Sequence, residues 1–155
     1  MMVEFEIFPE RPNLDRLQID CYDGEYFIFE PTGYGSAAEA AWFDVENVDS
    51  TRLKGTLTIC VAKVYRLNVI KDGVYEGDGL KLVEKYLTQF HDKSLVKFVT
   101  FARSNGGSLE YVEHPEEGFG DLFLHMPVEV SRPANSKELL DELKPLIIKI
   151  YLLQV

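Results

Sequence analysis

The 155-residue sequence has little cysteine and no long hydrophobic run, and both shortages exclude classes of protein. Its two cysteines, Cys21 and Cys60, are too few for the disulfide framework of a small secreted domain, and their apolar surroundings predict two reduced thiols in the core. No apolar stretch approaches the roughly 18 residues of a transmembrane helix, because Lys149 interrupts the longest one, 146–153. The first residues are acidic where a signal peptide is basic and then apolar. We therefore expect a cytoplasmic protein.

Positive charge is scarce in the first third of the chain. Residues 1–50 contain 12 acidic and 2 basic residues, which accounts for the whole net charge of −10, whereas residues 51–155 contain 14 of each. Binding to nucleic acid or to anionic lipid requires cationic groups, so this distribution argues against both. It favours a basic protein partner, because complementary charge speeds association and rejects wrong partners. The alternative is that the charge only keeps the protein in solution.

The remaining composition is that of a globular domain. The chain is 46% hydrophobic and 27% charged, and its length suits one domain over residues 1–155. An aromatic content of 12% favours sheets over helical bundles. Expected strands, interrupted by three expected helices and joined by hairpin turns, indicate an α+β fold. We predict a mainly antiparallel sheet built from hairpins and packed with two to three helices.

The strongest local signal is the pair Asp23-Gly24 between two apolar runs, which predicts a β-hairpin. A two-residue turn there predicts three cross-strand pairs: Cys21 with Tyr26, Ile19 with Ile28, and Asp20 with Phe27. One face of this hairpin would then be aliphatic. The other would carry Phe27 and Phe29 beside acidic and polar residues, either covered by a helix or exposed as an aromatic and acidic patch.

Alternating or β-branched residues predict further strands at 3–7, 53–70, 94–103, 108–114 and 122–130. Asn105, Gly106 and Gly107 lie between the third and fourth of these, and they predict a second hairpin. The expected cross-strand pairs of that hairpin are Arg103 with Glu110 and Phe101 with Val112.

Three helices are expected. Ser36 and Glu39 have the spacing of a capping box, which predicts a short helix through Phe43, followed by an acidic loop over 44–50. Apolar residues at helical spacing predict a second helix over 79–91.

The third helix is expected at the C-terminus. Asn135 is its predicted N-cap, with Glu138 three residues later. The β-branched content of 146–153 leaves a final strand open as an alternative for that segment.

Two segments carry weak signals of small-ligand chemistry. Residues 33–38 match the loose spacing G-x-G-x-x-A of a dinucleotide-binding turn, but nearby acidic residues would repel phosphate, and an ordinary turn before a helix is favoured. The segment 110–125 combines His114 and His125 with several carboxylates, which together can bind a divalent metal or perform acid–base chemistry. Its spacing matches no helical metal motif, so solvated loop charges are favoured there.

The preferred functional hypothesis is a non-catalytic acidic binding module, of inhibitor or immunity type, that docks on a basic protein partner. Aromatic anchors surrounded by carboxylates suit a surface that binds arginine and lysine. The predicted partner-binding residues are Asp20, Asp23, Glu25, Phe27, Phe29, Trp42, Asp44, Glu46 and Asp49. No catalytic residue, metal ligand or cofactor is predicted.

Two other functions stay open at this stage. One is a small α+β enzyme or metal-binding protein that uses His114, His125 and nearby carboxylates. The other is an assembly subunit whose apolar end, Leu152-Leu153, packs against a second copy of the chain.

Overall fold

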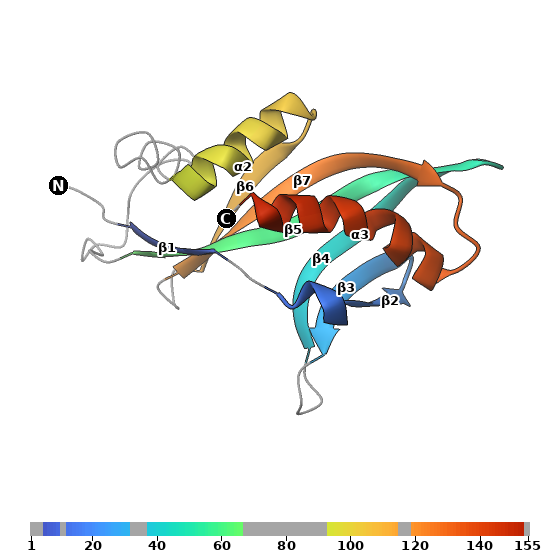
Figure 1. Ribbon diagram of the computed structural model, residues 1–155, viewed down its shortest axis with the longest axis horizontal. Coiled ribbons are helices and arrows are strands. Elements are labelled where there is room, and N and C mark those ends of the chain that lie inside the picture. Colours follow the sequence, from blue (N-terminus) through green and yellow to red (C-terminus); the bar gives the residue numbers. More distant parts are fainter. Residues whose placement is uncertain (1–4, 10–11, 32–36, 67–92, 115–118, 154–155) are drawn as a thin grey trace.

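An antiparallel sheet forms most of the computed structural model, which describes residues 5–9, 12–31, 37–66, 93–114 and 119–153 (Figure 1). Its strands are β1 (Phe5–Pro9), β2 (Gln18–Tyr22), β3 (Glu25–Pro31), β4 (Ala37–Val48), β5 (Arg52–Arg66), β6 (Ser108–His114) and β7 (Phe119–Ser131). The helical elements described are the 3₁₀ turn η1 (Leu14–Arg16) and the helices α2 (Lys93–Ser104) and α3 (Ser136–Leu152). The predicted α+β class with a mainly antiparallel sheet is confirmed.

The strands are ordered β2-β3-β4-β5-β7-β6, and every neighbouring pair is antiparallel. Strand β5 is 15 residues long and organises this sheet. One edge of β5 pairs with β4 along residues 53–59 and with β1 along residues 62–66, while the other edge pairs with β7. Because β5 is central and long, it brings strands from both ends of the chain into one surface.

Helix α3 covers one face of the sheet, which we call the inner face; the opposite face is the outer face (Figure 1). Fully buried side chains of the helix recur at helical spacing: Leu139, Leu143, Ile147 and Ile150. They share one core with fully buried strand residues, among them Ile28, Phe43, Leu57 and Leu124. The alternation of the strands therefore sends aliphatic residues and Phe43 inward, whereas polar residues and several aromatic ones lie on the outer face.

Asn135 caps the N-terminus of α3 as predicted. The Asn135 side chain accepts a hydrogen bond from the Glu138 N–H at 2.9 Å, and the Glu138 carboxylate accepts one from the Ala134 N–H at 2.7 Å. The helix continues through Pro145 to Leu152, so the alternative of a final strand at 146–153 is wrong. Near its end, the Tyr151 hydroxyl donates to the Cys60 carbonyl at 3.1 Å and fastens α3 to β5.

The first hairpin is confirmed to the residue. Strands β2 and β3 pair Cys21 with Tyr26, Ile19 with Ile28, and Asp20 with Phe27. The turn residues Asp23 and Gly24 have φ of 51° and 79°, the left-handed values that a two-residue turn requires. The predicted strands at 108–114 and 122–130 are also confirmed as β6 and part of β7, and 53–66 is confirmed as β5.

The predicted helix over 36–43 and the predicted loop over 44–50 are wrong, because residues 37–48 form β4. The burial of this strand alternates: Ala41 and Phe43 are fully buried, whereas Trp42 is half-buried and Asp44 exposed. This period of two is a strand signal, and it prevails over the capping-box spacing because Phe43 gains a place in the core.

The second predicted hairpin is also wrong, since 93–104 forms α2. Gly106 has φ of 71°, and the Gly107 N–H donates to the Ala102 carbonyl at 2.8 Å, which is the usual left-handed end of a helix. Strand β6 pairs with β7 instead, so Glu110 lies opposite Phe123 and Val112 opposite Asp121. Glycine pairs occur at helix ends and at hairpin turns alike, which explains the error.

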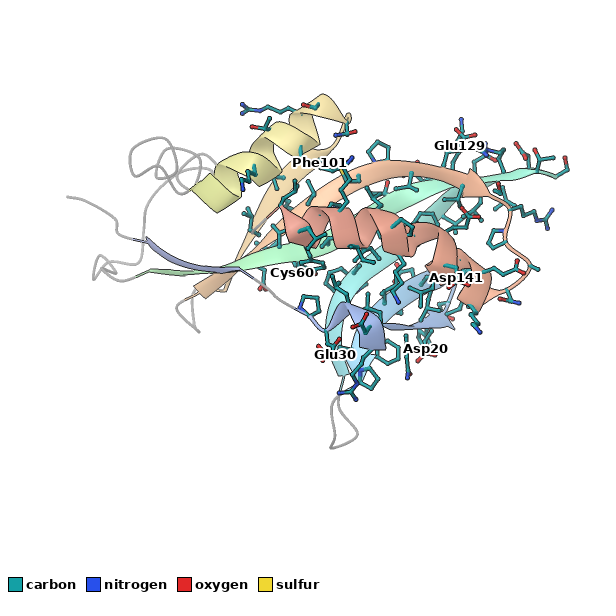
Figure 2. The ribbon with its side chains drawn as sticks, in the orientation of Figure 1. Asp20, Glu30, Cys60, Phe101, Glu129 and Asp141 are labelled. Atoms are coloured by element: carbon teal, nitrogen blue, oxygen red, sulfur yellow. The ribbon has the colours of Figure 1, made fainter. Side chains whose placement is uncertain are left out.

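The thiol prediction is half right. Both cysteines are free, and Cys60 is buried, but Cys21 is exposed on β2, an edge strand whose residues are mostly exposed. The predicted helix over 79–91 lies outside the described residues. In the described part of the chain, no helix is long and apolar enough to span a membrane. Figure 2 shows Cys60 on β5, near the C-terminal end of α3.

Candidate functional site

The outer face gathers most of the predicted partner-binding residues. Residues directly opposite each other in paired strands point to the same face. The register pairs Asp20 with Phe27, Phe27 with Trp42, and Glu25 with Asp44. Seven of the nine predicted residues share this face on β2, β3 and β4: Asp20, Glu25, Phe27, Phe29, Trp42, Asp44 and Glu46.

The other two predicted residues lie in turns. Asp23 occupies the tight turn between β2 and β3. Asp49 closes the turn between β4 and β5, where its carboxylate accepts from the N–H groups of Thr51 and Arg52 at 2.8 and 2.7 Å. These backbone hydrogen bonds lower the pKa of Asp49 below its ordinary range. The structure thus gives Asp49 a role in shaping the turn.

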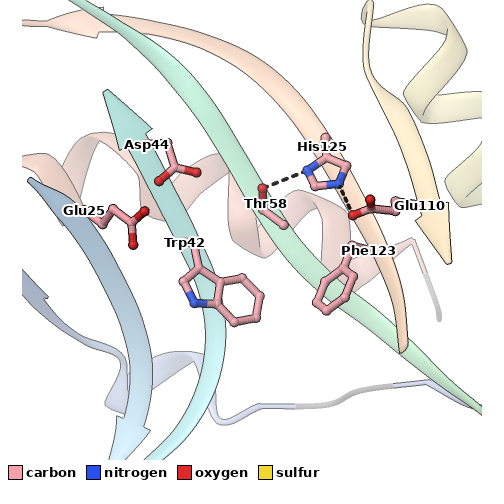
Figure 3. A pocket seen from close by; sticks show the side chains of 7 residues that line it. All are labelled: Glu25, Trp42, Asp44, Thr58, Glu110, Phe123 and His125. Carbon is pink, nitrogen blue, oxygen red and sulfur yellow. Dashed lines mark hydrogen bonds and ion pairs between the residues drawn. The ribbon is translucent and has the colours of Figure 1, made fainter. Parts of the chain in front are cut away.

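A shallow pocket of about 280 Å³ lies in the middle of the outer face (Figure 3). Its lining residues come from strands β3 to β7: Glu25, Trp42, Asp44, Thr58, Glu110, Phe123 and His125. The register shows why the sheet is hollow here, because the small Thr58 of β5 lies between the large side chains of Trp42 and His125.

The pocket has an aromatic floor. The rings of Trp42 and Phe123 lie 5.5 Å apart between centroids and meet edge to face at 69°. This is the arrangement that aromatic pairs prefer, and it holds the indole of Trp42 in place. Both rings are half-buried, so each still offers apolar surface to a ligand.

One wall is a chain of hydrogen bonds. The Thr58 hydroxyl lies 2.8 Å from Nδ1 of His125, and Nε2 of the same imidazole lies 3.0 Å from a carboxylate oxygen of Glu110 (Figure 3). In a neutral ring, Nε2–H donates to Glu110 and Nδ1 accepts from the Thr58 hydroxyl. The His125 ring is thereby fixed in orientation, and its side chain is 29% exposed.

The opposite wall carries two carboxylates of like charge. Glu25 and Asp44 are exposed and lie directly opposite each other on β3 and β4, beside the indole of Trp42 (Figure 3). No lysine or arginine in the described ranges is within salt-bridge distance of either. Glu129, farther along the outer face, is different, because Arg52 and Lys54 lie 3.2 and 3.9 Å from it.

The two histidines proposed as a joint site are far apart. His125 lies opposite Ser108, the first residue of β6, whereas His114 is the last residue of β6. Six residues of extended chain separate these positions by about 20 Å. Among the residues that the structure describes, no group of three or more metal-binding side chains converges. His125 therefore hydrogen-bonds with Thr58 and Glu110, and the strand register does not bring His114 beside it.

The nucleotide alternative also loses its structural basis. Residues 33–36 lie outside the described ranges, but Ala37 and Ala38 begin strand β4. A dinucleotide-binding turn needs a helix there, because the helix N-terminus supplies the N–H groups that hold the pyrophosphate.

Thr58 and Phe123 are pocket residues that no sequence motif indicated. Each belongs to a correctly predicted strand, but only the register between β4, β5 and β7 places them beside Trp42 and His125. The function must be argued from this geometry. Comparison of the chain with protein-family models, curated proteins and solved structures finds no match.

Proposed function

We propose that the protein is a non-catalytic binding module that docks its outer face on a basic protein partner. The observation that supports this best is the pocket, where Glu25 and Asp44 stand beside Trp42 without a described cation to neutralise them. A partner's arginines and lysines would supply the missing positive charge. The aromatic rings would supply the buried anchors on which interface energies depend.

Further aromatic and acidic residues lie beside the pocket on the outer face. Phe27 and Phe29 are half-buried on the same face, and exposed Asp20 lies opposite Phe27. The basic residues Arg52 and Lys54 stand at the far end of the face and are held by Glu129. The β2–β3–β4 region therefore presents carboxylates around aromatic rings, a pattern that steers cationic surfaces toward it.

Such a module would act by occlusion. A basic enzyme that works on an anionic substrate uses cationic side chains to hold it, and carboxylates seated on those side chains exclude the substrate. This is the mechanism of the inhibitor or immunity type, and it requires no catalytic group in the module itself.

Two double variants with equal loss of charge test this proposal. The outer-face variant is Glu25→Gln with Asp44→Asn, and the helix variant is Asp141→Asn with Glu142→Gln, at exposed positions on α3 (Figure 2). Each is used as bait in extracts of the native host at low and at high salt. We expect wild type and the helix variant to retain one stoichiometric basic protein at low salt, and the outer-face variant to lose it.

Two outcomes would contradict the proposal. One is the absence of any stoichiometric partner at either salt concentration. The other is equal retention by the outer-face and helix variants, which would place the interface elsewhere on the molecule.

A second candidate function is acid–base chemistry at His125, which the Thr58–His125–Glu110 chain favours. A hydroxyl, an imidazole and a carboxylate in hydrogen-bonded series can activate the hydroxyl as a nucleophile. This candidate is weaker because Thr58 lies in mid-strand, where backbone N–H groups are used by the sheet and are not aimed at a reacting oxygen. Hydrolysis of p-nitrophenyl acetate that is abolished by both Thr58→Val and His125→Gln would favour it over the binding module.

A further inference from the structure

We propose that the pocket receives one guanidinium group, the end of an arginine side chain of the basic partner. This inference rests on the proposed function and names the group that the outer face binds. The volume of about 280 Å³ is slightly below the usual range for drug-sized ligands, so it suits a single side chain.

The carboxylate wall calls for a cation. Like charges directly opposite each other on neighbouring strands destabilise a sheet, and Glu25 and Asp44 are such a pair. Residues that break a local stability rule are expected at functional sites. One cation between the two carboxylates would convert their repulsion into two attractions.

The floor of the pocket favours a planar cation. Guanidinium is flat and weakly hydrated, and it stacks on aromatic rings while its N–H groups fork toward carboxylate oxygens. The half-buried indole of Trp42, which borders both Glu25 and Asp44, offers these two contacts together (Figure 3). An ammonium group is compact and strongly hydrated, so it would gain less from the ring.

The wall formed by Thr58, His125 and Glu110 directs the guanidinium toward the opposite wall, which carries Glu25 and Asp44. Glu110 also lines the pocket, but its carboxylate is engaged by the imidazole of His125 at 3.0 Å. The hydrogen bond between the Thr58 hydroxyl and Nδ1 of His125 holds that imidazole in place. Glu25 and Asp44 accept no hydrogen bond from another described residue, so the guanidinium lies against the indole with its N–H groups toward these two carboxylates.

Trp42 provides a direct readout, because it is the only tryptophan in the chain. Its indole N–H resonance is followed by NMR during titration with N-acetylarginine amide, N-acetyllysine amide and N-acetylcitrulline amide. Citrulline has the shape of arginine without its charge. We expect a saturable shift with the arginine compound at a Kd on the order of 1–10 mM, as befits a fragment with few atoms at an open site. The lysine compound should bind at least about threefold more weakly, and the citrulline compound should produce no saturable shift.

Single variants locate the ligand. Glu25→Gln and Asp44→Asn should each weaken binding of the arginine compound by roughly threefold to tenfold, because each removes one charge-assisted partner. Asp141→Asn on α3 should leave the Kd unchanged. Thermal unfolding of each variant is measured first, and neither pocket variant should lower Tm, since each relieves the repulsion between like charges.

Three results would overturn the guanidinium assignment. They are an equal response to arginine and citrulline, equal or tighter binding of lysine, and an equal effect of Asp44→Asn and Asp141→Asn. If wild type captures a basic partner while the arginine compound leaves Trp42 unmoved, this inference fails and the proposed function stands. If arginine shifts Trp42 but no basic partner is captured, the docking function fails and only a guanidinium pocket remains.

Discussion

At the scale of single residues, small residues of the long strand β5 leave space on both faces of the sheet. Thr58 leaves the pocket open between Trp42 and His125, and Gly55 leaves room on the inner side for Phe43. The sequence predicts β5 as a strand, yet it does not indicate which neighbour fills the space beside each small residue. That information lies in the register, which is set by pairing with β4 and β7.

Gly55 is a strict test of that packing. A Cβ on Gly55 would stand 2.6 Å from Cζ of Phe43 and would also meet the backbone carbonyl of Asp44. We expect Gly55→Ala to lower the free energy of unfolding by about 1–3 kcal/mol, because an overpacked core must shift its side chains or backbone. Urea denaturation measures the change.

A double-mutant cycle with Phe43→Leu identifies the cause. The shorter side chain removes the ring atoms nearest to the added methyl group, so the double variant should lose less stability than the sum of the two single variants. Strictly additive losses would show that the Phe43 ring does not limit position 55.

Asp49 gives a residue-scale prediction about pH. Backbone hydrogen bonds from Thr51 and Arg52 lower its pKa in the folded state below the ordinary value of 3.8. A lowered folded pKa means that the charged form stabilises the fold above the unfolded pKa, and that this contribution disappears as pH falls through the folded pKa. We therefore expect Asp49→Asn to lower Tm at neutral pH, with the difference from wild type narrowing below pH 3.8. A difference in Tm that stays constant from pH 7 to pH 2 would contradict this role.

At the scale of elements, two agreeing local signals support the correct predictions of α3 and of the first hairpin. Asn135 and Glu138 begin α3 before a helical apolar pattern, and Asp23-Gly24 separates two runs with strand periodicity. Agreement did not suffice at 94–107, where a strand-like run and a glycine pair predicted a hairpin but 93–104 forms α2. In 37–48, by contrast, the alanine-rich start of the segment and a capping-box spacing indicated a helix against the alternation of Ala41 to Glu46. The long-range pairing with β3 and β5 decided for a strand, because it buries Phe43 completely.

The candidate site could be predicted only in part from the sequence. The predicted hairpin register aligned Asp20 with Phe27 and put Phe27 and Phe29 on one face. Trp42 and Asp44 were expected in a helix and a loop, and only the pairing of β4 with β3 places them on that face. The second half of the pocket, with Phe123 and His125, was not predictable. It depends on β7 lying beside β5, a pairing between segments that are distant in sequence and that no local pattern specifies.

Helix α3 gives the element-scale prediction. Leu143 is fully buried against the inner face, whereas Leu152 at the end of the same helix is 57% exposed. We expect Leu143→Ala to lower the free energy of unfolding by about 2–5 kcal/mol, since it removes buried methyl groups and leaves a cavity. Leu152→Ala is the matched control and should change it by less than about 0.5 kcal/mol. Similar losses in both variants would mean that α3 does not hold the sheet through this stripe.

At the scale of the whole molecule, the acidic excess is concentrated where the fold exposes it. The strands that come from the first third of the chain, β2 to β4, form one end of the sheet, and their outward residues include Asp20, Glu25 and Asp44. The helices lie on the inner face and cover the apolar side of the sheet (Figure 1). Within the described ranges no helix lies on the outer face, which combines acidic side chains with half-buried aromatic rings, and the proposed docking surface follows from this division of the two faces.

A surface arranged for a cationic ligand should reduce the stability of the free protein. If Glu25 and Asp44 repel each other, the outer-face variant should unfold at a higher temperature than wild type. Its gain in free energy of unfolding should be below about 1 kcal/mol, because both groups are exposed. The gain should shrink in about 1 M salt, where the Debye length falls to about 3 Å and screens the pair. The helix variant removes the same charge from α3, so it shows how much of any gain comes from net charge alone. A larger Tm for the outer-face variant than for the helix variant at low salt would mean that the free protein gives up stability to keep both carboxylates. Equal Tm values would mean that the pair is relaxed in the free protein, and the electrostatic argument for a bound cation would lose its basis.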